Sequence, residues 1–333
     1  MSLLTNAQNL LHFQFLTPAH AAGDGVRAFQ VLPLYMPKSA KGNLLWKRVK
    51  TGAFVFGNNL KMRLRKNVHI TALGTEGLFA NYLQVLQVLR RLRPDGNAKV
   101  DWTLTGDEPG FRYGQIGEDV WSHLFKLRQP APQGPCWQPH HFLDLTLWRA
   151  GKDYLRGDAL QQQRYEYNKV INDWIEVTNP RVLAETEHYY EQFMRNNFCV
   201  GVHRRVVNGG TTFLQASRKM PTTEEVIERA KDEIRNSGAA SAVVYLATDD
   251  REAVEKFREA FGDRLVVREE VQRTTSNDAE VHWQDWGKLS LVDAEDPLID
   301  ALLLAKCDVM LHVSSSVSTA VSFMNPDLRL VHV

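Results

Sequence analysis

Short apolar runs alternate with amphipathic segments throughout residues 198–333, and this alternation constrains the fold more than any other feature of the chain. The apolar runs are typical of strands buried on both faces, and the segments between them carry apolar residues at helical spacing. Strands that alternate with helices predict βαβ units and a parallel sheet. The expected strands cover residues 198–202, 242–247, 265–267, 309–313 and 328–333.

The expected helices of this part carry start signals. Residues Thr222–Glu225 form a capping box, and Asp250 is a suitable N-cap for a second helix. Asp296 and Pro297 are expected to open a third helix, because proline suits the first helical position. A short helix over 317–324 is expected after the strand 309–313.

The N-terminal half is less regular. It contains an expected strand at 68–73, a glycine turn at 74–77 and a strongly amphipathic helix at 78–92. A strand, a glycine turn and a helix can also bind phosphate. Residues 101–157 read as irregular, and residues 159–196 as helical with a break at Pro180.

The composition argues against several classes of protein. The 40 basic and 39 acidic residues leave a net charge of +1, without the basic excess typical of a nucleic-acid partner. No stretch approaches the roughly 18–20 apolar residues of a membrane span. Three cysteines are too few for a disulfide framework, and Cys199 and Cys307 are expected in the core. We therefore expect a cytoplasmic protein, the alternative being a secretory-pathway protein without its leader.

Polar residues follow the expected strands where each strand ends. His203 and Arg205 follow the strand 198–202, Asp249 follows the next, and Ser314–Ser316 follow the strand 309–313. Because ligands of parallel sheets bind beyond the carboxyl ends of the strands, these residues are expected to share one cleft. A guanidinium and a row of hydroxyls at a helix start suit a nucleotide diphosphate. The alternatives are charges that face solvent and serines that only cap the helix.

Asp300 lies within the apolar segment 298–304. An acid at that position is either on the solvent face or buried with a donor partner, and the amide-type donors of a guanine ring would suit it. Metal chemistry is not expected, because the chain contains neither Asp-x-Asp nor His-Glu-x-x-His. A serine hydrolase is equally unsupported, because no Gly-x-Ser-x-Gly is present.

These motifs resemble the fucosyltransferase superfamily, which includes nodulation α-1,6-fucosyltransferases, the core-fucosylating enzymes of N-glycans and protein O-fucosyltransferases. The family motif Gly-Val-His-x-Arg stands here at Gly201–Arg205, and an aliphatic strand that ends in Thr-Asp stands at Tyr245–Asp249. An Asp in a helix, a Cys-Asp pair and paired serines follow in the family's order as Asp300, Cys307-Asp308 and Ser315-Ser316. The turn from Gly77 to Asn81 is similar to the family's Gly-x-x-x-Asn.

The resemblance implies an α/β fold of GT-B type with two Rossmann-like domains. Residues 1–196 would form the acceptor-side domain and residues 197–333 the nucleotide-sugar-binding domain. The implied reaction is an inverting transfer of fucose from GDP-fucose to a glycan or protein hydroxyl, without a metal or other cofactor.

The resemblance also implies roles for single residues. Arg205 would bind the β-phosphate and assist its departure, which makes it the expected catalytic residue. His203 and Asp300 would contact the guanosine, and Ser315 and Ser316 would hold the diphosphate. Three further residues would belong to the same site: Asp249 on the donor side, and Gly77 and Asn81 in a phosphate or acceptor turn.

One departure from the family pattern leaves the catalytic base unassigned. Family members often have an acid soon after the His-x-Arg, but residues 206–217 contain no Asp or Glu. Glu76 is one option for the base that takes the acceptor's proton. Two alternatives therefore stay open: a non-catalytic nucleotide- or glycan-binding protein on the same fold, and a glycosyltransferase with another nucleotide-sugar donor. Aromatic residues between 102 and 148 either stack on sugar rings or belong to the core.

Overall fold

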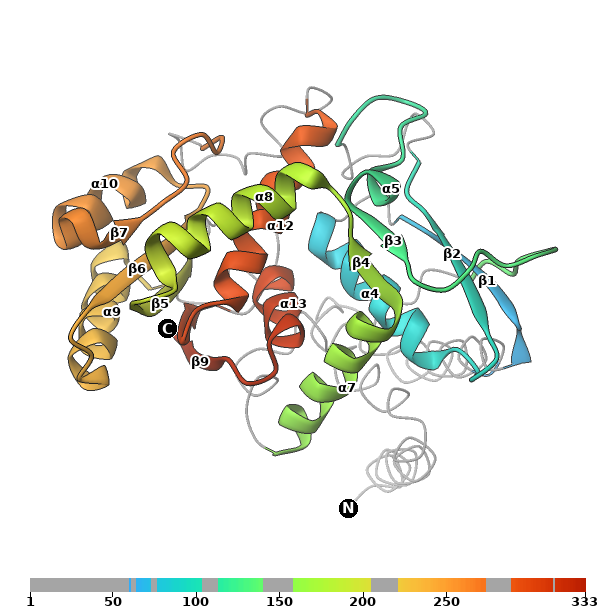
Figure 1. Ribbon diagram of the computed structural model, residues 1–333, viewed down its shortest axis with the longest axis horizontal. Helices are drawn as coiled ribbons and strands as arrows, with labels where there is room; N and C mark the ends of the chain where they lie inside the picture. The colour runs from blue at the N-terminus through green and yellow to red at the C-terminus, as the bar shows by residue number, and fades with distance from the viewer. Residues whose placement is uncertain are drawn as a thin grey trace, which may run out of the picture.

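The structure is a computed structural model in which eight parts of the chain are described (Figure 1). These parts are residues 60, 64–72, 77–103, 113–139, 158–204, 221–273, 289–313 and 315–333, with the backbone alone for residues 158–160. The predicted residues Arg205, Ser314 and Glu76 lie outside them.

Five parallel strands form the C-terminal sheet, in the order β7-β6-β5-β8-β9. Their bounds are Phe198–Arg204 for β5, Ala242–Thr248 for β6, Leu265–Val266 for β7, Val309–His312 for β8 and Arg329–His332 for β9. Along the chain, β6 and β7 are added on one side of β5, and β8 and β9 are then added on its other side. The point between β5 and β8 is therefore a topological switch point, where sheets of this kind bind ligands.

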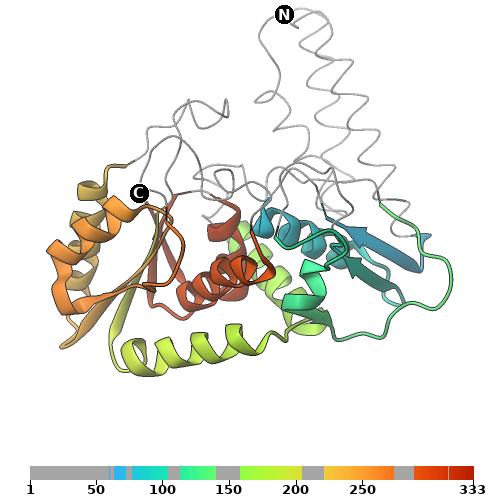
Figure 2. The same ribbon diagram turned by 90° about the horizontal axis from the view of Figure 1, so that it is seen from above.

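Helices cover both faces of this sheet (Figure 2). Helices α9 (Thr223–Ser237) and α10 (Arg251–Phe261) pack on the face that presents Val200, Leu246 and Leu311. Helices α12 (Leu291–Ala305) and α13 (Ser316–Met324) pack on the other face. Every residue of β6 and β8 is buried, as expected for strands covered on both sides.

The local signals for two helices are confirmed. Thr222 Oγ1 accepts a hydrogen bond from the Glu225 amide at 3.1 Å, and Glu225 Oε2 accepts one from the Thr222 amide at 2.8 Å. Asp250 caps α10 by accepting from the amide of Ala253. The five expected strands are present, and β5 continues two residues beyond the expected end at residue 202.

The expected start of the third helix at Asp296 and Pro297 is wrong. Helix α12 begins at Leu291, with Ser290 as its N-cap in a capping box with Asp293, so that Pro297 lies inside the helix. Proline in that position lacks the amide hydrogen bond to the preceding turn. Burial of Ala294 in the first turns and of Leu298 beyond the proline keeps the helix continuous.

In the N-terminal half, strand β1 (Asn67–Thr71), helix α4 (Leu78–Arg91) and strand β2 (Asn97–Asp101) form a parallel βαβ unit. The strand β1 and the helix α4 are confirmed, whereas β2 was not predicted, because its alternation of polar and apolar residues is only five residues long.

The segment that read as irregular contains helix α5 (Val120–Leu124) and strand β3 (Phe125–Leu127). Strand β3 pairs antiparallel with β4 (Ile175–Val177), which follows helix α7 (Asp158–Trp174). The expected break at Pro180 is confirmed: helix α8 (Pro180–Tyr189) begins there, capped by Asn179, and continues into a π-helical turn at Tyr190–Met194.

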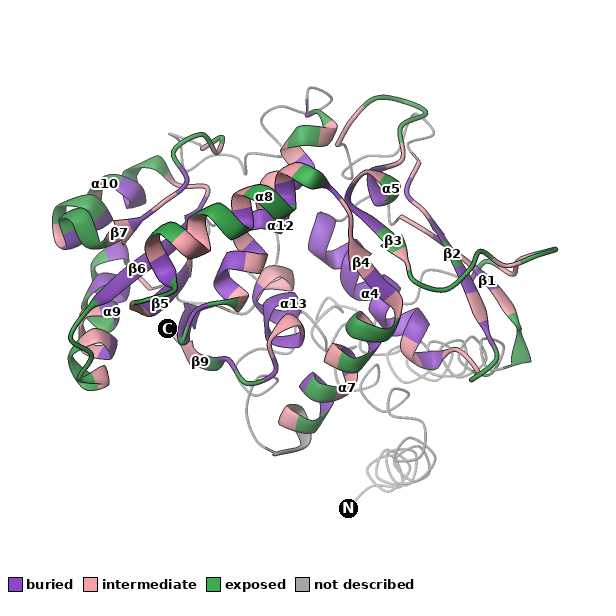
Figure 3. Ribbon diagram, viewed as in Figure 1, coloured by how far each residue is buried: buried purple, intermediate pink, exposed green. Residues whose placement is uncertain are grey.

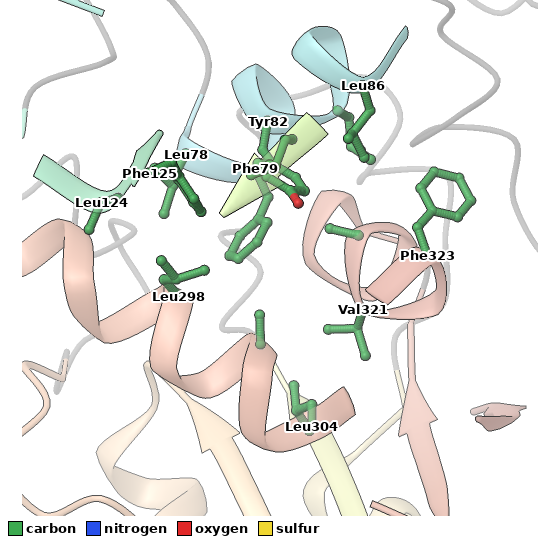
Figure 4. Close-up of a cluster of buried hydrophobic side chains, with 14 of the residues drawn as sticks. Leu78, Phe79, Tyr82, Leu86, Leu124, Phe125, Leu298, Leu304, Val321 and Phe323 are labelled. Carbon is green, nitrogen blue, oxygen red and sulfur yellow. The ribbon is translucent and has the colours of Figure 1, made fainter. Parts of the chain in front are cut away.

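One cluster of buried apolar side chains joins the N-terminal helices to the helices of the C-terminal sheet (Figure 4). Figure 3 shows that α4, α12 and α13 all carry buried residues. Phe79 and Tyr82 of α4 belong to the cluster together with Leu298 of α12 and Val321 of α13. On the far side of α13, the ring of Phe323 stacks on Tyr167 of α7, with centroids 4.4 Å apart. Helices from both halves of the chain are therefore fixed against each other.

Gly201 lies where β5 approaches α12 most closely. A Cβ atom at this residue would lie 2.8 Å from Cys307 Sγ and 3.0 Å from Leu304 Cδ2. We expect Gly201→Ala to lower the free energy of unfolding by about 1–3 kcal/mol, measured by urea denaturation, because the packed core has no room for the methyl group.

The double variant Gly201→Ala/Cys307→Ala tests the cause. Removal of the sulfur should recover part of the loss, because the two positions are in contact and their effects should not add. Gly77→Ala is the control, since a Cβ there meets nothing within 4 Å and should change stability little. Additive losses in the double variant would contradict the packing explanation.

Candidate nucleotide site

His203 lies near the carboxyl end of β5, in register with His312 of β8, which in turn is in register with His332 of β9. The three imidazoles follow one another along the carboxyl edge on the face that α12 and α13 cover. The His312 ring is buried and donates a hydrogen bond from Nδ1 to the Val313 carbonyl at 3.2 Å. Its plane is edge-on to the His332 ring, with centroids 5.4 Å apart.

The predicted serines lie at the start of α13. Ser315 is the N-cap, and its hydroxyl accepts from the Ser318 amide at 3.0 Å while Ser318 Oγ accepts from the Ser315 amide at 2.9 Å. The capping role that we considered for one serine is therefore confirmed for Ser315. Ser316 is the first residue of the helix, and in the described part of the chain its hydroxyl makes no hydrogen bond. The free amides of this first turn carry the positive end of the helix dipole.

The start of α13 and the end of β5 meet at the topological switch point. His203 pairs with His312, and Ser315 follows only three residues later on the same edge. The sheet therefore brings the predicted imidazole and the predicted serines together. Arg205 directly follows the last residue of β5, and its convergence with Ser316 stays a prediction because it lies outside the described residues.

Two further charged residues, Asp249 and Arg204, lie at the carboxyl edge of the sheet. Asp249 directly follows β6 and is half-buried. Arg204, the residue between His203 and Arg205, donates from Nη1 to Asp250 Oδ2 at 3.2 Å. Its side chain belongs to the face covered by α9 and α10, since successive strand residues point to opposite faces. Arg204 therefore ties the edge to the start of α10.

Asp300 is half-buried and has two donor partners, which favours the second of the two alternatives that the sequence left open. Its Oδ1 accepts from the Tyr245 hydroxyl at 2.7 Å and from Arg268 Nη1 at 3.2 Å. Burial raises the pKa of Asp300, and the guanidinium of Arg268 and the hydrogen bond from Tyr245 oppose that rise. Oδ2 has no donor among the described residues, and 18% of the side chain is exposed.

Arg268 is a site residue that the sequence analysis missed. It follows β7 and is only 3% exposed, although it carries a positive charge. It donates to Asp296 Oδ1 at 2.7 Å and to Glu185 Oε2 at 2.9 Å, in addition to Asp300. The sequence contained a signal for Arg268, because this residue is a cation just beyond the carboxyl end of an apolar strand. The same feature led to the prediction of Arg205.

A second buried acid, Glu295, joins three helices beside this group. Its Oε1 accepts from His123 Nε2 of α5 at 2.6 Å and from Asn179 Nδ2 at 2.9 Å, and its Oε2 accepts from Arg181 Nη1 of α8 at 2.8 Å. Arg181 also contacts Asp296, so the acids of α12 and the two arginines form one connected network.

The predicted N-terminal turn is a local structure at the start of α4. Asn81 Nδ2 donates to the Gly77 carbonyl at 3.2 Å, and the Asn81 amide donates to the same oxygen. In Figure 4, Leu78 of this first turn lies at the same end of the apolar cluster as Leu298 of α12. Whether Gly77 and Asn81 touch a ligand stays a prediction.

The aromatic residues considered for sugar stacking belong largely to the core. Trp102 and Trp121 are buried, with ring centroids 5.0 Å apart. Tyr113 and Trp137 are partly buried and pack at the margin of the same cluster. Phe111 and Trp148 lie outside the described residues.

Two further findings concern metal ligands and membrane-spanning helices in the described part of the chain. No group of three or more His, Cys, Asp or Glu side chains there is arranged to hold a metal ion. No helix in the same residues has both the length and the apolarity that crossing a bilayer requires.

A parallel sheet covered by helices on both faces defines an α/β protein, and the polar residues at its topological switch point form a candidate ligand site. The family model of Nodulation protein Z (NodZ) matches residues 162–325, just under half of the chain. The match supports the resemblance to the fucosyltransferase superfamily and, with it, the expected class of enzyme, a glycosyltransferase. The parallel sheet with helices on both faces confirms the α/β fold class. No protein with a curated description matches the chain.

Several solved structures are similar to the chain at low identity. The structure of NodZ alpha-1,6-fucosyltransferase soaked with GDP-fucose is 14% identical, with 78% of this chain and 92% of that chain covered and a TM-score of 0.45. Fucosyltransferase NodZ from Bradyrhizobium is 13% identical, with 79% and 92% covered and a TM-score of 0.43. POFUT1 in complex with GDP is 11% identical, with 80% and 98% covered and a TM-score of 0.39.

Proposed function

We propose that this protein transfers fucose from GDP-fucose to a hydroxyl of a glycan or protein, by an inverting mechanism that needs no metal. The observation that carries the proposal is the pairing of β5 with β8, which brings His203 and the start of α13 to one edge of the sheet. Amides at a helix start and a free serine hydroxyl suit a diphosphate. The family match supports the choice of a sugar nucleotide.

Each part of the site has a proposed role in binding the donor or the acceptor. Residues 197–333 hold the donor and residues 1–196 supply the acceptor side. Arg205 binds the β-phosphate, while Ser316 Oγ and the amides of the first turn of α13 bind the diphosphate; Ser315 holds that turn through its cap. His203 and Asp300 contact the guanosine, and Asp249 lies at the same edge.

In the proposed reaction the acceptor oxygen forms a bond to the anomeric carbon of fucose as the bond from that carbon to the β-phosphate oxygen breaks. The electron pair of the broken bond leaves with GDP, whose charge Arg205 offsets. The acceptor's proton passes to a base that is not yet assigned.

The test is turnover of GDP-fucose by the pure protein, measured as GDP released with and without candidate acceptors. We expect Arg205→Ala to abolish release while Arg251→Ala, which changes an exposed arginine on α10, leaves it unchanged. Both variants should unfold at the same temperature as the parent chain. Equal turnover in Arg205→Ala would reject the catalytic assignment.

A thermal-shift comparison separates the alternatives. A ligand that binds only the native state raises the melting temperature, so GDP should raise it more than UDP does. A preference for UDP would overturn the choice of donor. Binding of GDP without any turnover would instead favour a non-catalytic nucleotide-binding protein, the reading suggested by the absence of an acid in residues 206–217.

A further inference from the structure

The carboxylate of Asp300 is used asymmetrically. Both of its donors, the Tyr245 hydroxyl and Arg268 Nη1, bind the same oxygen, Oδ1. Oδ2 accepts from no group in the described parts of the chain, and the side chain keeps 18% of its surface exposed. A half-buried acid whose second oxygen has no donor among the described residues can accept hydrogen bonds from a group outside the helix.

The strand order puts both partners of Asp300 on one side of β5. The start of α13 follows β8, and β5 ends at Arg204, next to His203. Tyr245 lies in the middle of β6, and Arg268 lies two residues after β7. In the proposed function the phosphates of GDP bind at the start of α13 and the end of β5, and Asp300 contacts the guanosine. The base would then lie on the β6 and β7 side of β5, where Tyr245 and Arg268 hold Asp300.

The chemistry of the base favours an ionised acid at this place. Guanine presents two adjacent donors, the N1–H and the 2-amino group, and the open oxygen Oδ2 can accept from them while Oδ1 keeps its two donors. A protonated carboxyl group has lost one acceptor position and the negative charge that strengthens both bonds. The protonation state of Asp300 therefore decides how well guanine is distinguished from other bases.

The surroundings of Asp300 act on its charge in opposite directions. Burial raises its pKa, whereas Arg268 and the Tyr245 hydroxyl lower it. The other charged groups that face it are Arg273 after β7, Asp296 on α12 and Glu185, which shares Arg268. The two arginines favour the ionised form and the two acids oppose it.

From this geometry we infer that Arg268 and Tyr245 are positioning residues, which keep Asp300 ionised with Oδ2 open and thereby set the preference for a guanine base. The inference rests on the proposed GDP-fucose donor, since it concerns how the base of that donor is selected. Neither residue needs to touch the ligand.

The test compares the affinities of GDP and IDP by titration calorimetry between pH 6 and pH 8. IDP lacks only the 2-amino group, so the ratio of the two affinities reports on that contact, and titration of the phosphates cancels. The parent chain should prefer GDP by about tenfold at every pH, because a hydrogen bond to a charged group is worth about 1.5 kcal/mol or more.

Arg268→Gln should make this preference depend on pH. The carboxylate is present above the pKa of Asp300, so the preference for GDP is lost as the pH falls through that pKa. Removal of the guanidinium raises the pKa of Asp300, so the ratio should begin to fall from about tenfold toward equality at a higher pH in this variant than in the parent chain. The matched control is Arg258→Gln, an exposed arginine on α10 that also pairs with two acids; its ratio should not change with pH.

Tyr245→Phe removes one donor to Oδ1 and leaves every bond of Arg268 in place, so it tests the inference even if Arg268→Gln does not fold. It should shift the loss of preference in the same direction by a smaller amount. A ratio that stays constant with pH in every folded variant would overturn the inference while the parent chain still binds GDP. Failure of the parent chain to bind GDP would instead overturn the proposed function.

Discussion

Replacement of Glu295 by Gln should lower the free energy of unfolding by about 3 kcal/mol. Glu295 is 4% exposed and accepts hydrogen bonds from His123, Asn179 and Arg181. The variant keeps the shape of the side chain but removes the buried negative charge on which three donors converge. Arg181 then loses one of its three carboxylate partners and keeps Glu185 and Asp296. The loss should appear in urea denaturation as a lower midpoint with an unchanged slope.

The effect of Glu295 should also depend on pH. Burial opposes its ionisation, yet the bonds from Arg181, His123 and Asn179 leave the pKa of Glu295 lowered. A lowered pKa contributes stability that is present above the unfolded-state value of about 4.3 and disappears as the pH falls through the folded-state pKa. The difference between the parent chain and Glu295→Gln should therefore shrink in acid.

The control for this prediction is Glu259→Gln on the exposed face of α10. It makes the same chemical change without a buried partner and should stay within about 0.5 kcal/mol of the parent chain. If Glu295→Gln falls in the same range, the buried network does not stabilise the junction of α5, α8 and α12.

A comparably large loss, about 3 kcal/mol or more, is expected for Arg164→Met on α7. Arg164 is 7% exposed and donates to the carbonyls of Ser322, Asn325 and Leu328 at 3.1, 3.1 and 2.8 Å. These carbonyls end α13 and form the turn into β9, and methionine would leave them buried without donors. Hydrogen bonds from a charged group contribute most when the acceptors are shielded from water.

The exposed Arg235 at the end of α9 provides the matched control, since within the described residues it pairs only with Asp232 of its own helix. Arg235→Met should change the free energy of unfolding by less than about 0.5 kcal/mol. Equal effects of the two variants would mean that the carbonyls at the end of α13 are satisfied in another way when Arg164 is lost.

Local signals predicted much of the C-terminal fold. The strand β6 is apolar along its whole length, and the capping box at Thr222 fixes the start of α9 through bonds between residues three apart. Such features depend on near neighbours in the chain and can be read from the sequence. Pro297 shows the limit of this reasoning, because packing of α12 against other helices outweighed the usual position of proline.

The site could be predicted in part for the same reason. The rule that polar residues gather at the carboxyl ends of parallel strands brought His203 and Ser315 to one edge, as the strand pairing confirms. The sequence could not show that the Ser315 hydroxyl is used by Ser318, because a cap and a ligand require the same residue type. It also gave no sign that Arg268 pairs with Glu185, since the two residues are 83 positions apart.

The shared apolar cluster affects how this protein can be divided for experiments. A cut between residues 196 and 197 would separate α4 and α7 from α13 and expose the buried faces of Tyr82, Tyr167 and Phe323 to water. Each fragment alone would then be prone to aggregate. Exchange of the C-terminal sheet with that of a similar protein should therefore carry the matching residues of α4 and α7 along with the sheet, rather than join two independent halves.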